Sequence, residues 1–119
     1  LIVSISTLEH VGWDEEQYAK QSSDDSLHPN VTILDAINNL KRCLRGDGFM
    51  IMTLPIGQNP VLDALMQKKQ IPFTRQYFLK RVSRDNRWEE VNWERVKDIQ
   101  YGEPFPHANG VIVGYIERQ

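Results

Sequence analysis

Two apolar runs of strand length, separated by one amphipathic stretch of helical periodicity, constrain the fold of this chain more than any other feature of its sequence. The runs are residues 1–6 and 49–54. Between them, over residues 30–45, apolar side chains recur at spacings of three and four, which places them on one helical face. Continuous apolar strands joined through such a helix are typical of parallel strands with both sheet faces covered. The sequence therefore predicts two adjacent parallel strands linked by a right-handed helical crossover.

The ends of these elements carry local signals as well. Asn30 is expected to cap the first turn of the helix, and Gly46 to take the left-handed position after its last turn. The rest of the chain is predicted to form a helix from Asn59-Pro60 to Lys69, a strand over residues 74–83, a turn at residues 85–87, a short helix over 88–100, an extended stretch around Pro104 and Pro106, and a last strand over 110–117.

Composition excludes several classes of protein. The 119 residues carry a formal net charge of −2 at pH 7, so the chain has no polycationic field for packaging DNA or holding an anionic membrane. Its apolar runs are far shorter than the roughly 20 residues of a membrane-spanning helix. Cys43 is the single cysteine and no leader-like segment opens the sequence. We therefore expect a cytoplasmic location.

The chain begins directly in an apolar strand, with no cap or turn before it. Such a strand is expected in the middle of a sheet, with a neighbour on each side. We therefore expect residues 1–119 to be a single partial domain that needs either a missing N-terminal half or a homo-oligomer partner to cover its open edge.

Three segments resemble the class I, Rossmann-like S-adenosylmethionine-dependent methyltransferases. Ser4-Ile5-Ser6-Thr7-Leu8-Glu9-His10-Val11-Gly12 resembles the segment in which a strand of that family ends in small polar residues. Leu40-Lys41-Arg42-Cys43-Leu44-Arg45-Gly46-Asp47-Gly48 resembles the family's approach to its fifth strand, which residues 49–55 would form, and residues 110–118 would be its antiparallel last strand. The resemblance implies an α/β fold: the C-terminal half of a three-layer Rossmann-like mixed sheet, with parallel strands and an antiparallel last strand.

Two parts of the family's cofactor site have no counterpart in this sequence: the glycine-rich loop after the first strand and the acidic residue that ends the second. Gly46-Asp47-Gly48 does not replace the loop, because it comes after a helix and precedes a strand. The resemblance therefore implies a chain that is inactive alone and binds S-adenosyl-L-methionine poorly.

Ligands of open α/β sheets lie outside the carboxyl ends of the strands. The resemblance implies cofactor contacts from Ser4, Ile5, Ser6 and Thr7; alternatively, the two serines only end a strand and Thr7 caps the next helix. His10 is the candidate catalytic base, because imidazole exchanges protons near neutral pH. The alternative is that Glu9 and His10 only anchor the start of that helix. The candidate substrate-binding residues are Glu9, Pro55, Gly57, Trp88 and Tyr101.

The predicted function is methyl transfer to a small-molecule acceptor. The first alternative is a non-catalytic remnant or assembly module that pairs through its open sheet edge. A second is a nucleic-acid-modifying enzyme, suggested by the basic and aromatic residues within 75–88, although a solvated sheet edge accounts for the same residues. Three scattered histidines and one cysteine give no close-spaced ligand pair, so no metal site is expected.

Overall fold

The computed structural model describes residues 1–11 and 32–118. Within them the chain forms these elements: β1 (Ile2–Ile5), the 3-10 helix η1 (Leu8–His10), α2 (Ile33–Arg42), β2 (Phe49–Pro55), α3 (Pro60–Gln67), β3 (Arg75–Arg81), β4 (Trp88–Val91), the 3-10 helix η2 (Trp93–Arg95) and β5 (Gly110–Glu117). The Asn30 cap predicted for the first helix lies outside the described residues. In the part that is described, no helix is long and apolar enough to cross a membrane.

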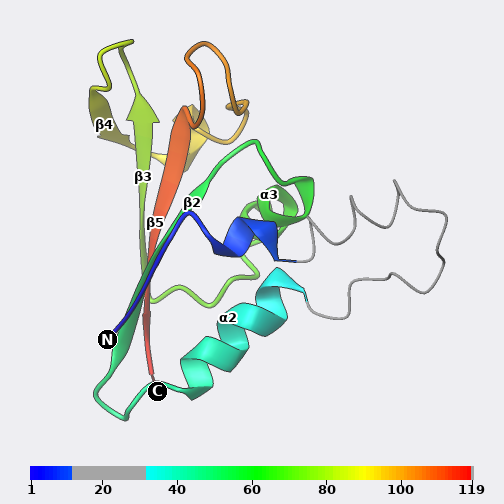
Figure 1. The fold of residues 1–119 in the computed structure, drawn as a ribbon, viewed down its shortest axis with the longest axis vertical. Helices are drawn as coiled ribbons and strands as arrows, with labels where there is room; N and C mark the ends of the chain where they lie inside the picture. The colour runs from blue at the N-terminus through cyan, green and yellow to red at the C-terminus, as the bar shows by residue number, and fades with distance from the viewer. Residues whose placement is uncertain (12–31, 119) are drawn as a thin grey trace, which may run out of the picture.

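The five strands form one mixed sheet in the order β1-β2-β5-β3-β4 (Figure 1). β1 and β2 are parallel neighbours with α2 in the connection between them, which confirms the predicted pairing. β5 is antiparallel to β2, as predicted, and it is inserted between β2 and β3. Because β3 is also antiparallel to β5, the strands β1, β2 and β3 all run in the same direction.

Thr32 caps the start of helix α2 through a reciprocal pair of hydrogen bonds. The Thr32 hydroxyl accepts a hydrogen bond from the Asp35 N–H at 3.1 Å, and the Asp35 carboxylate accepts one from the Thr32 N–H at 3.3 Å. The helix ends at Arg42, and Gly46 does not adopt the predicted left-handed conformation. The Arg118 guanidinium instead donates to the Leu44 carbonyl, so a residue beyond β5 satisfies this end of the helix.

The core lies on one face of the sheet. Alternate residues of β2 and β5 are buried beneath the helices, which lie on the same side of the sheet in Figure 1. The fully buried side chains of this core are Ile33, Ile37, Met50, Met52, Leu54, Ile56, Leu62, Val96, Ile112 and Ile116.

The opposite face is not covered by a helix of the described residues. The prediction that β1 is buried on both faces is wrong for these residues: Val3 and Ile5 are 55% and 67% exposed, while their neighbours in the strand are half-buried. The described part of the chain is therefore an α/β fold of two layers. A third layer would have to come from residues that are not described.

The helix predicted over residues 88–100 is also wrong. Residues Trp88–Val91 form β4, an antiparallel edge strand paired with β3 through the predicted turn at residues 85–87. Trp93 comes next, in η2, and packs its ring 5.4 Å from that of Phe78. Pairing with β3 and this aromatic contact outweigh the weak helical periodicity of the segment.

The stretch after η2 is likewise not extended as predicted. Residues 101–107 form turns and bends. Asn109 closes them: its side-chain carbonyl accepts from the Phe105 N–H at 3.1 Å, and its amide donates to the carbonyls of Phe105 and His107 at 2.8 and 3.1 Å. The prolines of this segment have no N–H group to donate to a neighbouring strand. The side chain of the fully buried Asn109 supplies hydrogen bonds to the backbone of the segment instead.

Candidate functional site

The carboxyl ends of β1 and β2 lie side by side at one edge of the sheet. The Ser6 N–H donates to the Thr53 carbonyl at 3.0 Å and to the Thr53 hydroxyl at 3.2 Å. Ser6 adopts a φ of 46° and turns the chain out of the sheet, and the Thr7 hydroxyl donates back to the Ile5 carbonyl at 2.9 Å. Ser6 and Thr7 are thereby exposed at the end of β1.

Glu9 and His10 lie in η1, immediately beyond this turn. The Glu9 side chain is only 3% exposed, whereas that of His10 is 48% exposed, and the His10 Nε2 lies 3.8 Å from the Glu9 Oε2. The pair combines a buried carboxylate with an imidazole that solvent reaches. This arrangement is compatible with the anchoring role and with the proton-accepting role considered for His10.

Gly57 allows a close approach of two loops at the end of β2. It adopts a φ of 85°, and a Cβ atom there would overlap the carbonyl oxygen of Ile99. The Tyr101 N–H lies 3.5 Å from the Gly57 carbonyl oxygen. Tyr101 is therefore placed beside Gly57 even though the two residues are far apart in the sequence.

The Gly57 N–H donates to the Asp63 carboxylate at 3.0 Å. Burial raises the pKa of Asp63 above its ordinary value, and the hydrogen bond from Gly57 opposes that shift without cancelling it. Asp63 lies in the first turn of α3, so one side chain connects the end of β2 to the next helix.

Asn59 joins the two strand ends to each other. Its side-chain amide donates to the Glu9 carbonyl at 2.7 Å, while its side-chain carbonyl accepts from the N–H groups of Val61 and Leu62 at 2.9 and 3.3 Å. The sequence predicts the helix cap from the Asn-Pro pair, and the structure confirms it. The bond to Glu9 has no local signal, since the partners are 50 positions apart in the chain.

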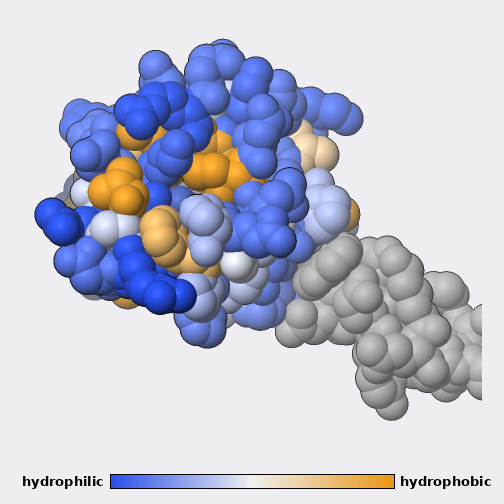
Figure 2. Space-filling view, turned by 90° about the horizontal axis from the view of Figure 1, so that it is seen from above, coloured by the Kyte–Doolittle hydropathy of each residue, from blue (hydrophilic) through white to orange (hydrophobic). Residues whose placement is uncertain are grey.

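The structure therefore brings most of the candidate residues to one end of the sheet, where β1 and β2 finish. They are Ser4, Ile5, Ser6, Thr7, Glu9, His10, Pro55, Gly57 and Tyr101. Of these, Ile5 directs its side chain to the helix-free face, because it lies opposite Thr53 and alternates with Ser4 along β1. Seen from above in Figure 2, this end of the molecule is largely hydrophilic, with hydrophobic residues gathered near its middle.

Trp88 lies apart from this group. It begins β4, which is three strands away from β2 in the sheet. At about 4.8 Å per strand, that separation is about 14 Å. The Trp88 indole N–H donates to the Asn86 side chain at 2.7 Å and so belongs to the turn between β3 and β4.

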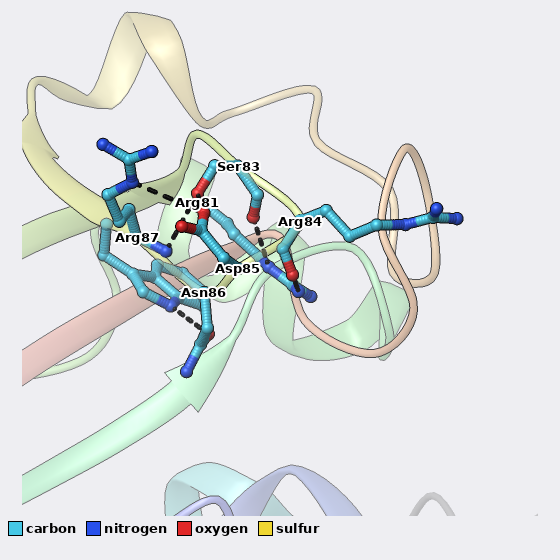
Figure 3. Close-up of polar contacts among 7 residues, drawn as sticks. Arg81, Ser83, Arg84, Asp85, Asn86 and Arg87 are labelled. Atoms are coloured by element: carbon cyan, nitrogen blue, oxygen red, sulfur yellow. Dashed lines mark hydrogen bonds and ion pairs between the residues drawn. The ribbon is translucent and has the colours of Figure 1, made fainter.

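Of the three arginines that Figure 3 labels at that turn, Arg81 and Arg87 contact other residues of the turn, whereas the Arg84 side chain extends away from it. The Arg81 guanidinium donates to three backbone carbonyls, those of Ser83, Arg84 and Pro106, at 3.1, 2.8 and 2.9 Å. It also lies 4.9 Å from the centre of the Phe105 ring. Arg81 thus ties the β3–β4 turn to the loop before β5.

Asp85 organises the tip of the same turn. The Ser83 hydroxyl donates to its carboxylate, and the Arg87 Nε lies 3.4 Å from it. These two contacts, that of Ser83 first, lower the pKa of the exposed Asp85 carboxyl. The Asp85 carboxylate thus offsets part of the positive charge at this turn.

A pocket of about 550 Å³ lies beside the β3–β4 turn, at the end of β3. It is lined by Lys80, Arg81, Asp98, Ile99, Gln100, Glu103, Pro104 and Asn109. The backbone carbonyl of Ile99 also lies directly against Gly57. This pocket is therefore next to the site at the end of β2. Its lining contains both positively and negatively charged side chains, so the lining does not favour either an anionic or a cationic ligand.

Among residues 1–11 and 32–118 no cluster of three or more metal-ligating side chains is present. No protein-family model, curated protein or solved structure matches the chain. The function must therefore be inferred from the chain itself.

Proposed function

We propose that this chain is the C-terminal part of a class I, Rossmann-like S-adenosyl-L-methionine-dependent methyltransferase domain that methylates a small-molecule acceptor. The observation that carries the proposal is the juxtaposition of the β1 and β2 ends, where Ser6 bonds to Thr53. Binding outside the carboxyl ends of neighbouring parallel strands is the general rule for ligands of α/β sheets. The antiparallel pairing of β5 with β2 supports the proposal, because the resemblance implies an antiparallel last strand beside this one.

The residues at this edge fit the methionine end of the cofactor. Ser6 and Thr7 are small, polar and exposed, and neither carries a positive charge that would repel a sulfonium. The cofactor supplies a methyl group activated by that sulfonium. What the protein must add is mainly a fixed geometry between donor and acceptor, and the bonds around Ser6 and Asn59 fix the loops that border the site.

The acceptor would lie between η1 and the Gly57–Tyr101 contact. The exposed His10 imidazole is the proposed proton acceptor for a hydroxyl or amine, with the buried Glu9 carboxylate beside it. The pocket next to Ile99 gives an acceptor room at the same end of the sheet.

The proposal requires residues outside this chain to hold the rest of the cofactor. A backbone nest from a glycine-rich loop and a ribose-binding carboxylate supply much of the affinity in dinucleotide-type sites, and neither has a counterpart here. The 119-residue chain alone should therefore bind S-adenosylmethionine weakly or not at all.

Calorimetric titration of two forms of the protein tests the proposal. A form extended upstream through a glycine-rich loop should bind the cofactor, and Ser6→Leu should weaken that binding by about tenfold, because a bulky apolar side chain would stand at the cofactor edge. Gln70→Leu is the matched control, since Gln70 is an exposed polar residue away from the strand ends. Absence of saturation at millimolar cofactor in the extended protein would refute the methyltransferase assignment.

The nucleic-acid alternative receives less support. Arg81 and Arg87 are engaged with backbone carbonyls and Asp85, and Arg75 lies 5.9 Å from the Tyr115 ring on the helix-free face of the sheet. Oligonucleotide affinity that falls steeply with salt would revive this alternative.

A further inference from the structure

We infer that β1 is a pairing edge, and that in the 119-residue chain its partner is β1 of a second copy in antiparallel orientation. β1 is a terminal strand of the described sheet, so one side of its backbone has no neighbouring strand there. This inference concerns assembly and does not depend on methyl transfer.

The hydrogen-bonding groups on that side belong to Val3 and Ile5. The N–H of Ser6 points to β2, where it bonds to Thr53. Successive residues of a strand direct their N–H and C=O groups to opposite sides, so those of Ser4 also face β2 while those of Val3 and Ile5 face outward. The Thr7 hydroxyl that reaches the Ile5 carbonyl agrees with this assignment.

β1 lacks the devices that keep sheet edges apart. Residues 1–6 contain no charged residue and no proline, and the pairing with β2 runs from Ile2 to Ile5 without a bulge. The other terminal strand, β4, carries Glu89 and Glu90 on exposed positions. Two copies of β4 would bring like charges together, whereas two copies of β1 bring none.

A second copy of β1 can pair about Ser4 without bringing like charges together, because residues 1–6 contain no charged residue. If Ser4 lies opposite Ser4 of the second copy, then Val3 lies opposite Ile5 of that copy and Ile5 opposite its Val3. Each of these two pairs can exchange both backbone hydrogen bonds, and a two-fold axis closes the assembly. The same pairing covers the two apolar side chains that are most exposed within β1.

Sedimentation equilibrium of the 119-residue chain tests the pairing directly. A four-residue strand contact is smaller than the roughly 800 Å² per partner of stable interfaces, so a weak dimer is expected over about 10–500 µM. The apparent mass should rise from 13.9 kDa toward twice that value. Val3→Lys and Ile5→Lys should each raise the dissociation constant by about tenfold or more.

The matched control is Val61→Lys, because Val61 is 50% exposed on α3, away from this edge. A chain that is monomeric at every concentration, or a dimer that tolerates both β1 substitutions, overturns the inference. If the upstream-extended form still binds S-adenosylmethionine in that case, the proposed function stands and only the pairing fails.

Two further measurements do not depend on the lysine variants folding. Amide exchange of Val3 and Ile5 should slow as concentration rises, while that of Ser6, already bonded to Thr53, should not change. Ser4→Cys in a Cys43→Ser background should form an intermolecular disulfide, since directly opposed Cα atoms lie within disulfide range. Val61→Cys in the same background should not, and equal cross-linking of both variants would contradict the pairing.

Discussion

At the scale of single residues, Asn59 has the most far-reaching contacts of the candidate site. Its side chain is buried, caps α3 and holds the η1 backbone through the Glu9 carbonyl. We expect Asn59→Ala to lower the free energy of unfolding by about 2–3 kcal/mol, because it removes a cap and leaves a buried carbonyl without its donor. Urea denaturation measures this change.

Asn59→Asp separates the two roles. The carboxylate can still accept from Val61 and Leu62 but cannot donate to Glu9, and it places a charge in a buried position. Its loss of stability should therefore persist although the cap remains. If Asn59→Asp were as stable as the original chain, the bond to Glu9 would have no energetic importance.

Asp63 gives the molecule a pH dependence of known sign. Because burial raises its pKa in the folded state above the ordinary 3.8, the folded chain holds this proton more tightly than the unfolded chain. The group favours folding below its unfolded pKa, and this contribution falls as the pH rises through the folded pKa. Asp63→Asn keeps an acceptor for the Gly57 N–H but has no such titration.

The stability of Asp63→Asn relative to the original chain should thus increase as the pH rises above the ordinary pKa of 3.8, and then level off once the buried carboxyl has ionised. Thermal unfolding of both proteins across this range measures the difference. A relative stability that falls over the same range would show that the Gly57 hydrogen bond, and not burial, dominates the pKa of Asp63.

At the scale of elements, Arg81 connects the β3–β4 hairpin to the loop before β5. Arg81→Met retains much of the aliphatic stem but loses three hydrogen bonds to carbonyls and the contact with Phe105. We expect it to lower the free energy of unfolding by about 2 kcal/mol. Arg84→Met, at an exposed position of the same turn, should change it by less than about 0.5 kcal/mol. Equal effects of the two substitutions would show that the bridge contributes nothing.

The elements differ in how far local sequence determines them. The β1–α2–β2 unit is predictable from the periodicity of its apolar residues, and α3 from Asn59-Pro60, because these signals act within a few residues. β4 could not be predicted in this way. Its four residues, Trp88–Val91, become a strand only through pairing with β3, and their sequence has no clear alternation.

The same limit applies to the candidate site. The places where the apolar runs stop are enough to put Ser6 and Gly57 at strand ends. The separation of Trp88 from them depends on strand order, and the proximity of Tyr101 to Gly57 depends on a loop packed across the end of β2. Neither relation is encoded within a short window of sequence.

At the scale of the whole molecule, β5 has the largest share of sheet pairing. It is the one strand of the described sheet that joins the β1–β2 pair to the β3–β4 hairpin, and Gly114 lets the Phe73 ring pack directly on its backbone. A side chain at Gly114 would displace that ring. The central strand of the described sheet is therefore β5, the strand that comes last in the sequence.

This order has a consequence for synthesis. While the ribosome still holds residues 110–117, the segments of β2 and β3 have been made but lack the strand that lies between them. Both then present an unpaired edge to other chains and to each other. The nascent protein can complete its sheet only after β5 has left the ribosome. Until then, the unpaired edges of β2 and β3 need protection from contact with other chains.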